Sequence, residues 1–357
     1  MIKKLKVTKK NDDDILILNN DKVIRDIKFK MAGKNPISFV DGGITDGVCV
    51  RCDAKPCLLY SKEEIDIDII EGMPYNNDRR ICPSNAISKN EQGGVDINSK
   101  LCINCGVCVS KCQSGGIFYN NNTETFEVNH SYDESFKLIN NPLDPLVKDT
   151  ERQFNNCDVI LEIDKITTGF ANNYVNKFKS LNSGIIDLEL VLVRNLLLEI
   201  GIGNKVSANG NNDLRLDFIG VDNEKMIPGE SELIGSDILG LPRRILEGIT
   251  WLHSRKKVDI TNQIPCVVVF VFPRKRSDFY EVITDIEIVT NVKIKTLSIY
   301  FLSIINLFKV KLNASDLDKY FTINKEHQDY GPYFKAFIKN IESIDENYGT
   351  ELYTFSK

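Results

Sequence analysis

The chain has 357 residues, enough for two or three domains, and its 42% hydrophobic and 27% charged residues are typical of a globular protein. Its net charge of −5 excludes a general attraction to nucleic acid or to an anionic membrane. No apolar run reaches the roughly 18 residues of a membrane-spanning helix, and the amino terminus turns acidic at Asp12–Asp14, where a signal peptide would be apolar. We therefore expect a cytoplasmic protein without a membrane partner.

The first part of the chain, residues 1–40, predicts a small β extension. Apolar and polar residues alternate over 15–18, 22–30 and 37–40, as they do in short half-buried strands. No catalytic pattern accompanies them. We expect this segment to pack beside the region that follows it.

Cysteine is concentrated in the next region. Eight of the ten cysteines lie between Cys49 and Cys112, and only Cys157 and Cys266 lie outside that interval. In a reducing cytoplasm such a concentration indicates metal binding rather than disulfide bonds. The two remaining cysteines are predicted to be ordinary buried thiols.

The eight cysteines form two runs. They are Cys49, Cys52 and Cys57 with a remote Cys82-Pro83, and then Cys102, Cys105, Cys108 and Cys112. The second run has the spacing C-x2-C-x2-C-x3-C, with which cysteines hold [4Fe–4S] clusters, and a proline after the remote cysteine is its usual companion. Gly106, after the second cysteine of that run, lets the backbone approach a cluster closely.

These runs resemble the two-cluster bacterial ferredoxin domain, which predicts an α+β ferredoxin-like fold over residues 41–125. The resemblance implies two [4Fe–4S] clusters. One would be held by Cys49, Cys52, Cys57 and Cys112, and the other by Cys82, Cys102, Cys105 and Cys108. The chain departs from the family pattern in the four residues between Cys52 and Cys57, in an insertion over 58–81, and in Gln113, where a proline is usual.

Zinc is the alternative metal, because C-x2-C pairs also form zinc ribbons. Such pairs are usually separated by about a dozen residues or more. A third cysteine at the same short spacing has no use in a tetrahedral site. The spacing therefore favours iron–sulfur clusters.

A linker is predicted over residues 126–150, which are rich in Asn, Asp and Pro. The remainder, 151–357, predicts an α/β domain with a mixed central sheet and helices on both faces. We expect helices over 170–181, 185–200, 238–253, 277–289, 302–309 and 333–344, and strands over 213–221, 225–234, 264–272 and 292–299. Gly201 is expected to end the second helix, and Pro228-Gly229 to interrupt the second strand.

Four acidic residues of this domain are candidates for a metal site. Glu230 and Glu232 are two positions apart on one predicted strand, so their side chains share a face. A hairpin would bring them towards Asp217, and Glu189 lies on the buried helix before it. Clustered carboxylates repel one another unless a cation neutralises them, and oxygen ligands favour Mg²⁺ or Mn²⁺. Such an ion can activate a water molecule against a phosphodiester.

The same segment resembles the restriction-endonuclease-like, or PD-(D/E)xK, nuclease superfamily, in particular its Mrr-like branch. The resemblance rests on Glu189–Gly201, Asn212–Asp217 and Glu230–Glu232. It implies a restriction-endonuclease-like fold that cleaves DNA. Asp217 and Glu230 would be the metal ligands, with Glu189 nearby and Glu232 in the orienting position that lysine has in most relatives.

The acidic residues, the basic segment and the function each have an alternative interpretation. Acidic residues commonly form the solvated face of a strand. The segment Arg243–Arg276 has eight basic residues against only Glu247 and Asp259, which suits either a phosphate backbone or simple solubility. Two functions stay open: a metal-dependent nuclease with an appended two-cluster module, or an electron-transfer protein with a redox partner and a non-catalytic docking domain.

Overall fold

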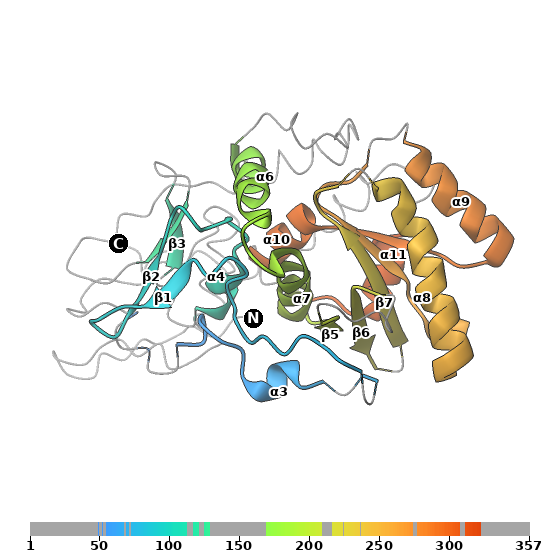
Figure 1. Cartoon of the computed structure of the whole chain (residues 1–357), viewed down its shortest axis with the longest axis horizontal. Coiled ribbons are helices and arrows are strands. Elements are labelled where there is room, and N and C mark those ends of the chain that lie inside the picture. Colours follow the sequence, from blue (N-terminus) through green and yellow to red (C-terminus); the bar gives the residue numbers. More distant parts are fainter. Residues whose placement is uncertain are drawn as a thin grey trace, which may run out of the picture.

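The protein is described here from a computed structural model (Figure 1). The structure describes residues 49, 52, 55–67, 69–70, 73–112, 117–120, 125–128, 169–208, 216–223, 225–235, 237–273, 277–307 and 311–322. The predictions for residues 1–40, for Cys157, for most of the linker and for the helix at 333–344 lie outside these residues. Within the described ranges, no helix is long and apolar enough to cross a membrane.

The cysteine region consists of short elements joined by loops. They are α3 (Lys62–Ile65), α4 (Val107–Lys111) and two antiparallel hairpins, β1–β2 (Ile87–Lys89, Val95–Ile97) and β3–β4 (Ile117–Asn120, Thr125–Val128). Helix α3 begins with a capping box, in which Ser61 and Glu64 each satisfy the other's backbone N–H. Strand β4 covers the first residues of the predicted linker, whose remainder lies outside the described residues.

The second half of the chain is an α/β domain with a mixed sheet, as predicted, and the sheet has five strands. Its strands are β5 (Gly203–Val206), β6 (Phe218–Asp222), β7 (Lys225–Glu232), β8 (Cys266–Val269) and β9 (Lys295–Ser298). Its helices are α6 (Gly169–Asn182), α7 (Leu188–Ile200), α8 (Leu241–Lys256), α9 (Asp278–Thr290), α10 (Ile299–Leu307) and α11 (Ala314–Tyr320), with 3-10 turns η2 (Ile238–Gly240) and η3 (Ile260–Asn262). Strand β5 and helix α11 were not predicted.

The sheet has the order β5-β6-β7-β8-β9. The first three strands are antiparallel, whereas β7, β8 and β9 are parallel and are joined through α8 and α9. The β6–β7 hairpin is the one predicted from the acidic residues, and it pairs Phe218 with Gly229. Glu232 is opposite Val269 at the carboxyl ends of the two parallel strands.

Strand β7 continues through Pro228-Gly229, so the predicted interruption is wrong. The β7–β8 ladder begins only at Gly229, so the missing N–H of Pro228 removes no bond from that pair. A Cβ on Gly229 would lie 1.9 Å from the Phe218 ring. Glycine is therefore needed because Phe218 crosses the hairpin at this point.

Helix α7 lies between the sheet and the cysteine region (Figure 1). It is buried along most of its length, as its apolar sequence predicted, and it ends before Gly201, which has a left-handed φ of 106°. Helices α8 and α9 cover the other face of the sheet. Helix α4 packs against α7 and α10, and the buried apolar side chains of both halves form one continuous core.

Candidate functional site

The structure gathers the eight cysteines of the two runs into two groups. Burial, together with repulsion from the neighbouring thiols of Cys112, Cys49 and Cys52, raises the pKa of Cys57 to about 12. Cys112 thus lies with the first run, although it belongs to the second run in sequence. All four thiols are free of disulfide bonds.

The second group contains the other four cysteines. Burial raises the pKa of Cys105 and of Cys108, and repulsion from the thiols of Cys82 and Cys102 adds to both increases. These four cysteines line one cavity, together with apolar side chains that include Ile87, Ile97, Ile103 and Phe126. A cavity walled by four thiols and hydrocarbon is a suitable environment for a sulfur-ligated cluster.

Backbone N–H groups point at two of the sulfur atoms. The N–H of Val95 donates to Cys49 Sγ at 3.2 Å, and the N–H of Ala86 donates to Cys82 Sγ at 3.1 Å. Such bonds stabilise a thiolate more than a thiol. Gly106 has a φ of 75°, a left-handed conformation that costs glycine little.

Lys55 lies in the lengthened interval of the first run, between Cys52 and Cys57. This lysine is buried, and its Nζ donates to the carbonyl oxygen of Cys49 at 2.7 Å and to that of Cys52. Its charge favours the thiolate of Cys49. The sequence analysis missed this residue, although a lysine between two ligand cysteines was the available signal.

The insertion over residues 58–81 attaches the cysteine region to the α/β domain. Tyr75 forms an isolated bridge with Ser207 at the end of β5, and the N–H of Asn76 donates to Val206 O at 3.0 Å. The Asn76 side chain also donates to Asp187 at 3.0 Å. The segment that departs from the ferredoxin pattern is therefore the one that makes these contacts.

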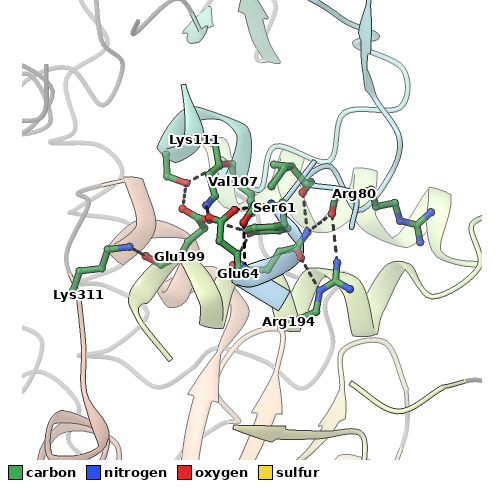
Figure 2. A network of polar contacts seen from close by, with 12 residues as sticks. Ser61, Glu64, Arg80, Val107, Lys111, Arg194, Glu199 and Lys311 are labelled. Carbon is green, nitrogen blue, oxygen red and sulfur yellow. Dashed lines mark hydrogen bonds and ion pairs between the residues drawn. The ribbon is translucent and has the colours of Figure 1, made fainter. Parts of the chain in front are cut away.

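Glu199 on α7 is the centre of a polar network between the two regions (Figure 2). Its buried carboxylate accepts from the Tyr60 hydroxyl at 3.0 Å and from the Ser110 hydroxyl at 2.8 Å, and it lies 3.2 Å from Lys111 Nζ. Lys111 also pairs with Glu64 at 2.5 Å. Since Lys111 precedes Cys112, the network holds one end of the first cysteine group.

One turn earlier, α7 contacts the loop that carries Cys82. Asn195 Nδ2 donates to Arg80 O at 3.0 Å and to Ile81 O at 2.8 Å, and the buried Arg194 donates to the carbonyl oxygens of Asp78 and Arg80. A single helix thus holds the chain beside a member of each cysteine group. The sequence suggested only that α7 is buried.

Two of the four predicted carboxylates are anchored by the end of β7. Asp217 Oδ2 accepts from the N–H of Ser231 at 2.7 Å and from its hydroxyl at 3.1 Å. Glu189 Oε1 accepts from the N–H of Leu233 at 3.1 Å. Burial raises the pKa of Glu189 to about 7, and the charges of Asp217 and Glu232 contribute to that increase.

The other two share an arginine that the sequence analysis had placed only in a basic segment. Arg244 Nε lies 3.3 Å from Glu230 and its Nη2 lies 3.3 Å from Glu232, while Nη1 pairs with Asp237 at 2.6 Å. Burial raises the pKa of Glu230 to about 8, with repulsion from Asp217 as the second cause, and Arg244 opposes the increase. Glu230 and Glu232 therefore share a face, as predicted, but their observed counter-ion is a guanidinium.

Within the described ranges, no three His, Cys, Asp or Glu side chains are arranged to hold a single metal ion. Among the basic residues that the structure describes, those of α8 do not form one patch either. Arg243 and Arg244 begin α8, whereas Arg255 and Lys256 end it, about 18 Å away along the helix axis. Residues 274–276 lie outside the described residues.

Comparison with known proteins adds little. No protein-family model matches the chain, and no curated protein matches it. Among solved structures, it is similar to the restriction endonuclease FokI, with 13% sequence identity and a TM-score of 0.32. The similarity covers 61% of this chain and 40% of that one, so the chain spans less than half of FokI. The class that the structure itself defines is a mixed α/β protein with a five-stranded sheet.

Proposed function

We propose that the chain is an iron–sulfur protein with two [4Fe–4S] clusters. The first would be held by Cys49, Cys52, Cys57 and Cys112, and the second by Cys82, Cys102, Cys105 and Cys108. The observation that carries the proposal is the position of Cys112. This cysteine belongs to the second run in sequence but lies with the first run in space. Exchange of the fourth cysteine between two clusters is a property of this spacing.

The cysteine groups suit clusters better than single ions. A [4Fe–4S] cluster takes one thiolate at each of four irons, so its ligands stand further apart than those of one tetrahedral ion. Bound clusters accept and release single electrons. The chain contributes the thiolates, the N–H donors of Val95 and Ala86, and the charge of Lys55.

Iron and acid-labile sulfide measurements on anaerobically purified protein test this proposal. About eight of each per chain are expected for two clusters. Stoichiometric zinc without sulfide would establish the alternative metal instead. Electron paramagnetic resonance of the reduced protein should show two interacting centres.

We further propose that the α/β domain hydrolyses phosphodiester bonds in DNA at the carboxylate site. Its support is a pair of carboxylates on the β6–β7 hairpin: the half-buried Asp217, which directly precedes β6, and the buried Glu230 on β7. Mg²⁺ commonly binds through one or two carboxylates and completes its shell with water and phosphate oxygens, so two ligands suffice. A bound Mg²⁺ or Mn²⁺ would supply an activated water. Ser231 holds Asp217 in place, and Glu189 holds the end of β7.

A nuclease assay with Mg²⁺ or Mn²⁺ on several DNA forms tests the second proposal. Asp217→Ala should abolish cleavage and leave the iron and sulfide content unchanged, because the proposed clusters lie in the other half of the chain. Equal cleavage by both proteins would assign the activity to a contaminant.

Electron transfer to a redox partner, with a non-catalytic α/β domain, is the competing function. One observation favours it: the guanidinium of Arg244 already pairs with both Glu230 and Glu232. Reversible reduction of the clusters, combined with no Mn²⁺ binding and no cleavage of any substrate, would establish this function.

A further inference from the structure

Arg244 is in an unusual position for a structural counter-ion. It contacts three carboxylates, those of Glu230, Glu232 and Asp237, from the first turn of α8. Its own side chain remains 37% exposed. The guanidinium side chain is therefore partly open to solvent, whereas Glu230 is buried.

Glu232 is correspondingly unsuited to the orienting role expected from the sequence. Its carboxylate is occupied by Arg244 Nη2, and the turn after β7 closes over it: a Cβ on Gly235 would lie 1.5 Å from Glu232 Oε1. Glu232 is therefore engaged by Arg244 and lies directly against the turn at Gly235. A carboxylate would also repel a phosphate, whereas a guanidinium attracts it.

We propose that Arg244 is the residue that binds the substrate phosphate at this site. The inference rests on the proposed phosphodiester hydrolysis. When a divalent cation neutralises Glu230, the N–H groups of Arg244 that face it become available to a non-bridging phosphate oxygen. A guanidinium presents its donors in a planar fork that matches two oxygens of one phosphate.

The proposed hydrolysis changes no oxidation state. The oxygen of water bonds to phosphorus, one P–O ester bond breaks, and one proton of the water ends on the departing ester oxygen. Arg244 stays protonated throughout, because its proton is never released at accessible pH. Its contribution is stabilisation of the charge that develops on the phosphate oxygens.

The test compares Arg244→Ala with Arg243→Ala, its exposed neighbour, which removes the same charge from the same helix turn. Arg244→Ala should lower kcat by about 10²- to 10³-fold, the usual effect of removing one such donor. Mn²⁺ binding, measured by electron paramagnetic resonance without DNA, should be at least as tight as in the wild type, because the carboxylates lose a competing cation. Arg243→Ala should match the wild type within about twofold in both measurements.

Several results would overturn the inference. Cleavage by Arg244→Ala at the wild-type rate would do so, and so would joint loss of Mn²⁺ binding and cleavage, which would make Arg244 a support for the carboxylates. If the alanine variant does not fold, Arg244→Lys decides: it keeps the charge but not the fork, so wild-type kcat would reject the inference. A wild type that binds no Mn²⁺ and cleaves nothing contradicts the proposed hydrolysis itself.

Discussion

The hydroxyl of Tyr60, in the insertion between two cysteines, donates to the buried carboxylate of Glu199 on α7 at a distance of 3.0 Å. The two residues are 139 positions apart. Because Ser110 and Lys111 bind the same carboxylate, three groups of the cysteine region converge on one residue of the α/β domain (Figure 2). The cysteine region is therefore attached by buried polar contacts as well as by the chain.

Removal of Glu199 should destabilise the whole protein. Glu199→Ala leaves the charge of Lys111 and the hydroxyl of Tyr60 without their buried partner, so we expect a loss of about 3–5 kcal/mol in the free energy of unfolding. Urea unfolding followed by far-ultraviolet circular dichroism, which reports on the helices and strands of both halves, measures it. Glu64→Ala removes the exposed partner of Lys111 and should cost about 1 kcal/mol or less. Equal losses in the two variants would contradict the network.

Loss of the first cluster should also weaken the α/β domain. Trp251 is the only tryptophan of the chain and lies on α8, on the far side of the sheet from the cysteines, so its fluorescence reports on that domain alone. Cys112→Ser should lower the midpoint of its unfolding transition, because α4, which packs against α7, would lose the proposed cluster at its carboxyl end. Cys266→Ser, at a buried cysteine of the sheet, is the control: it should leave the iron content unchanged. An unchanged midpoint in an iron-depleted Cys112→Ser protein would show that the two regions are independent.

Lys55 should raise the reduction potential of the first of the two proposed clusters. A positive charge beside a cluster stabilises the reduced form, which carries one more negative charge, so Lys55→Met should make that cluster harder to reduce. An anaerobic redox titration followed by electron paramagnetic resonance should show a lower potential for one centre and little change in the other. Lys100→Met, at an exposed site, is the control. A shift of equal size in both centres would mean a general charge effect.

Stability should depend on pH through Glu230. Its pKa is about 8 in the folded chain, compared with 4.5 for an ordinary glutamate, so the folded state binds the proton more tightly. The stability from this group is fully present below pH 4.5 and is lost as the pH rises through about 8. Without divalent cations, Glu230→Gln should flatten the fall in the free energy of unfolding between pH 5 and pH 8, whereas Asp237→Asn should not. Added Mg²⁺ should restore stability to the wild type at pH 8. If the free energy of unfolding falls equally in Glu230→Gln and Asp237→Asn, Glu230 is not the group responsible.

Much of the local structure follows from the sequence. The short spacing of the cysteines predicts that they act together as metal ligands, because side chains so close in sequence must lie close in space. The apolar pattern located helix α7 and strand β7, and α7 ends before Gly201 as predicted. Strand β5 was missed because Gly203–Val206 is short and has no clear alternation. Helix α11 was missed although Asn313 and Asp316 form a capping box that the sequence displays.

The tertiary structure alone decided which residues meet. Tyr60 and Glu199, or Arg244 and Glu230, are brought together by the packing of α7 and α8 on the two faces of the sheet. No local pattern encodes these contacts, because each depends on the register and rotation of elements that are distant in sequence. Periodicity specifies which face of a helix or strand is buried. Which buried carboxylate receives a lysine, an arginine or a hydroxyl is determined only when the faces pack, because hydrogen bonds and ion pairs act over a few ångströms.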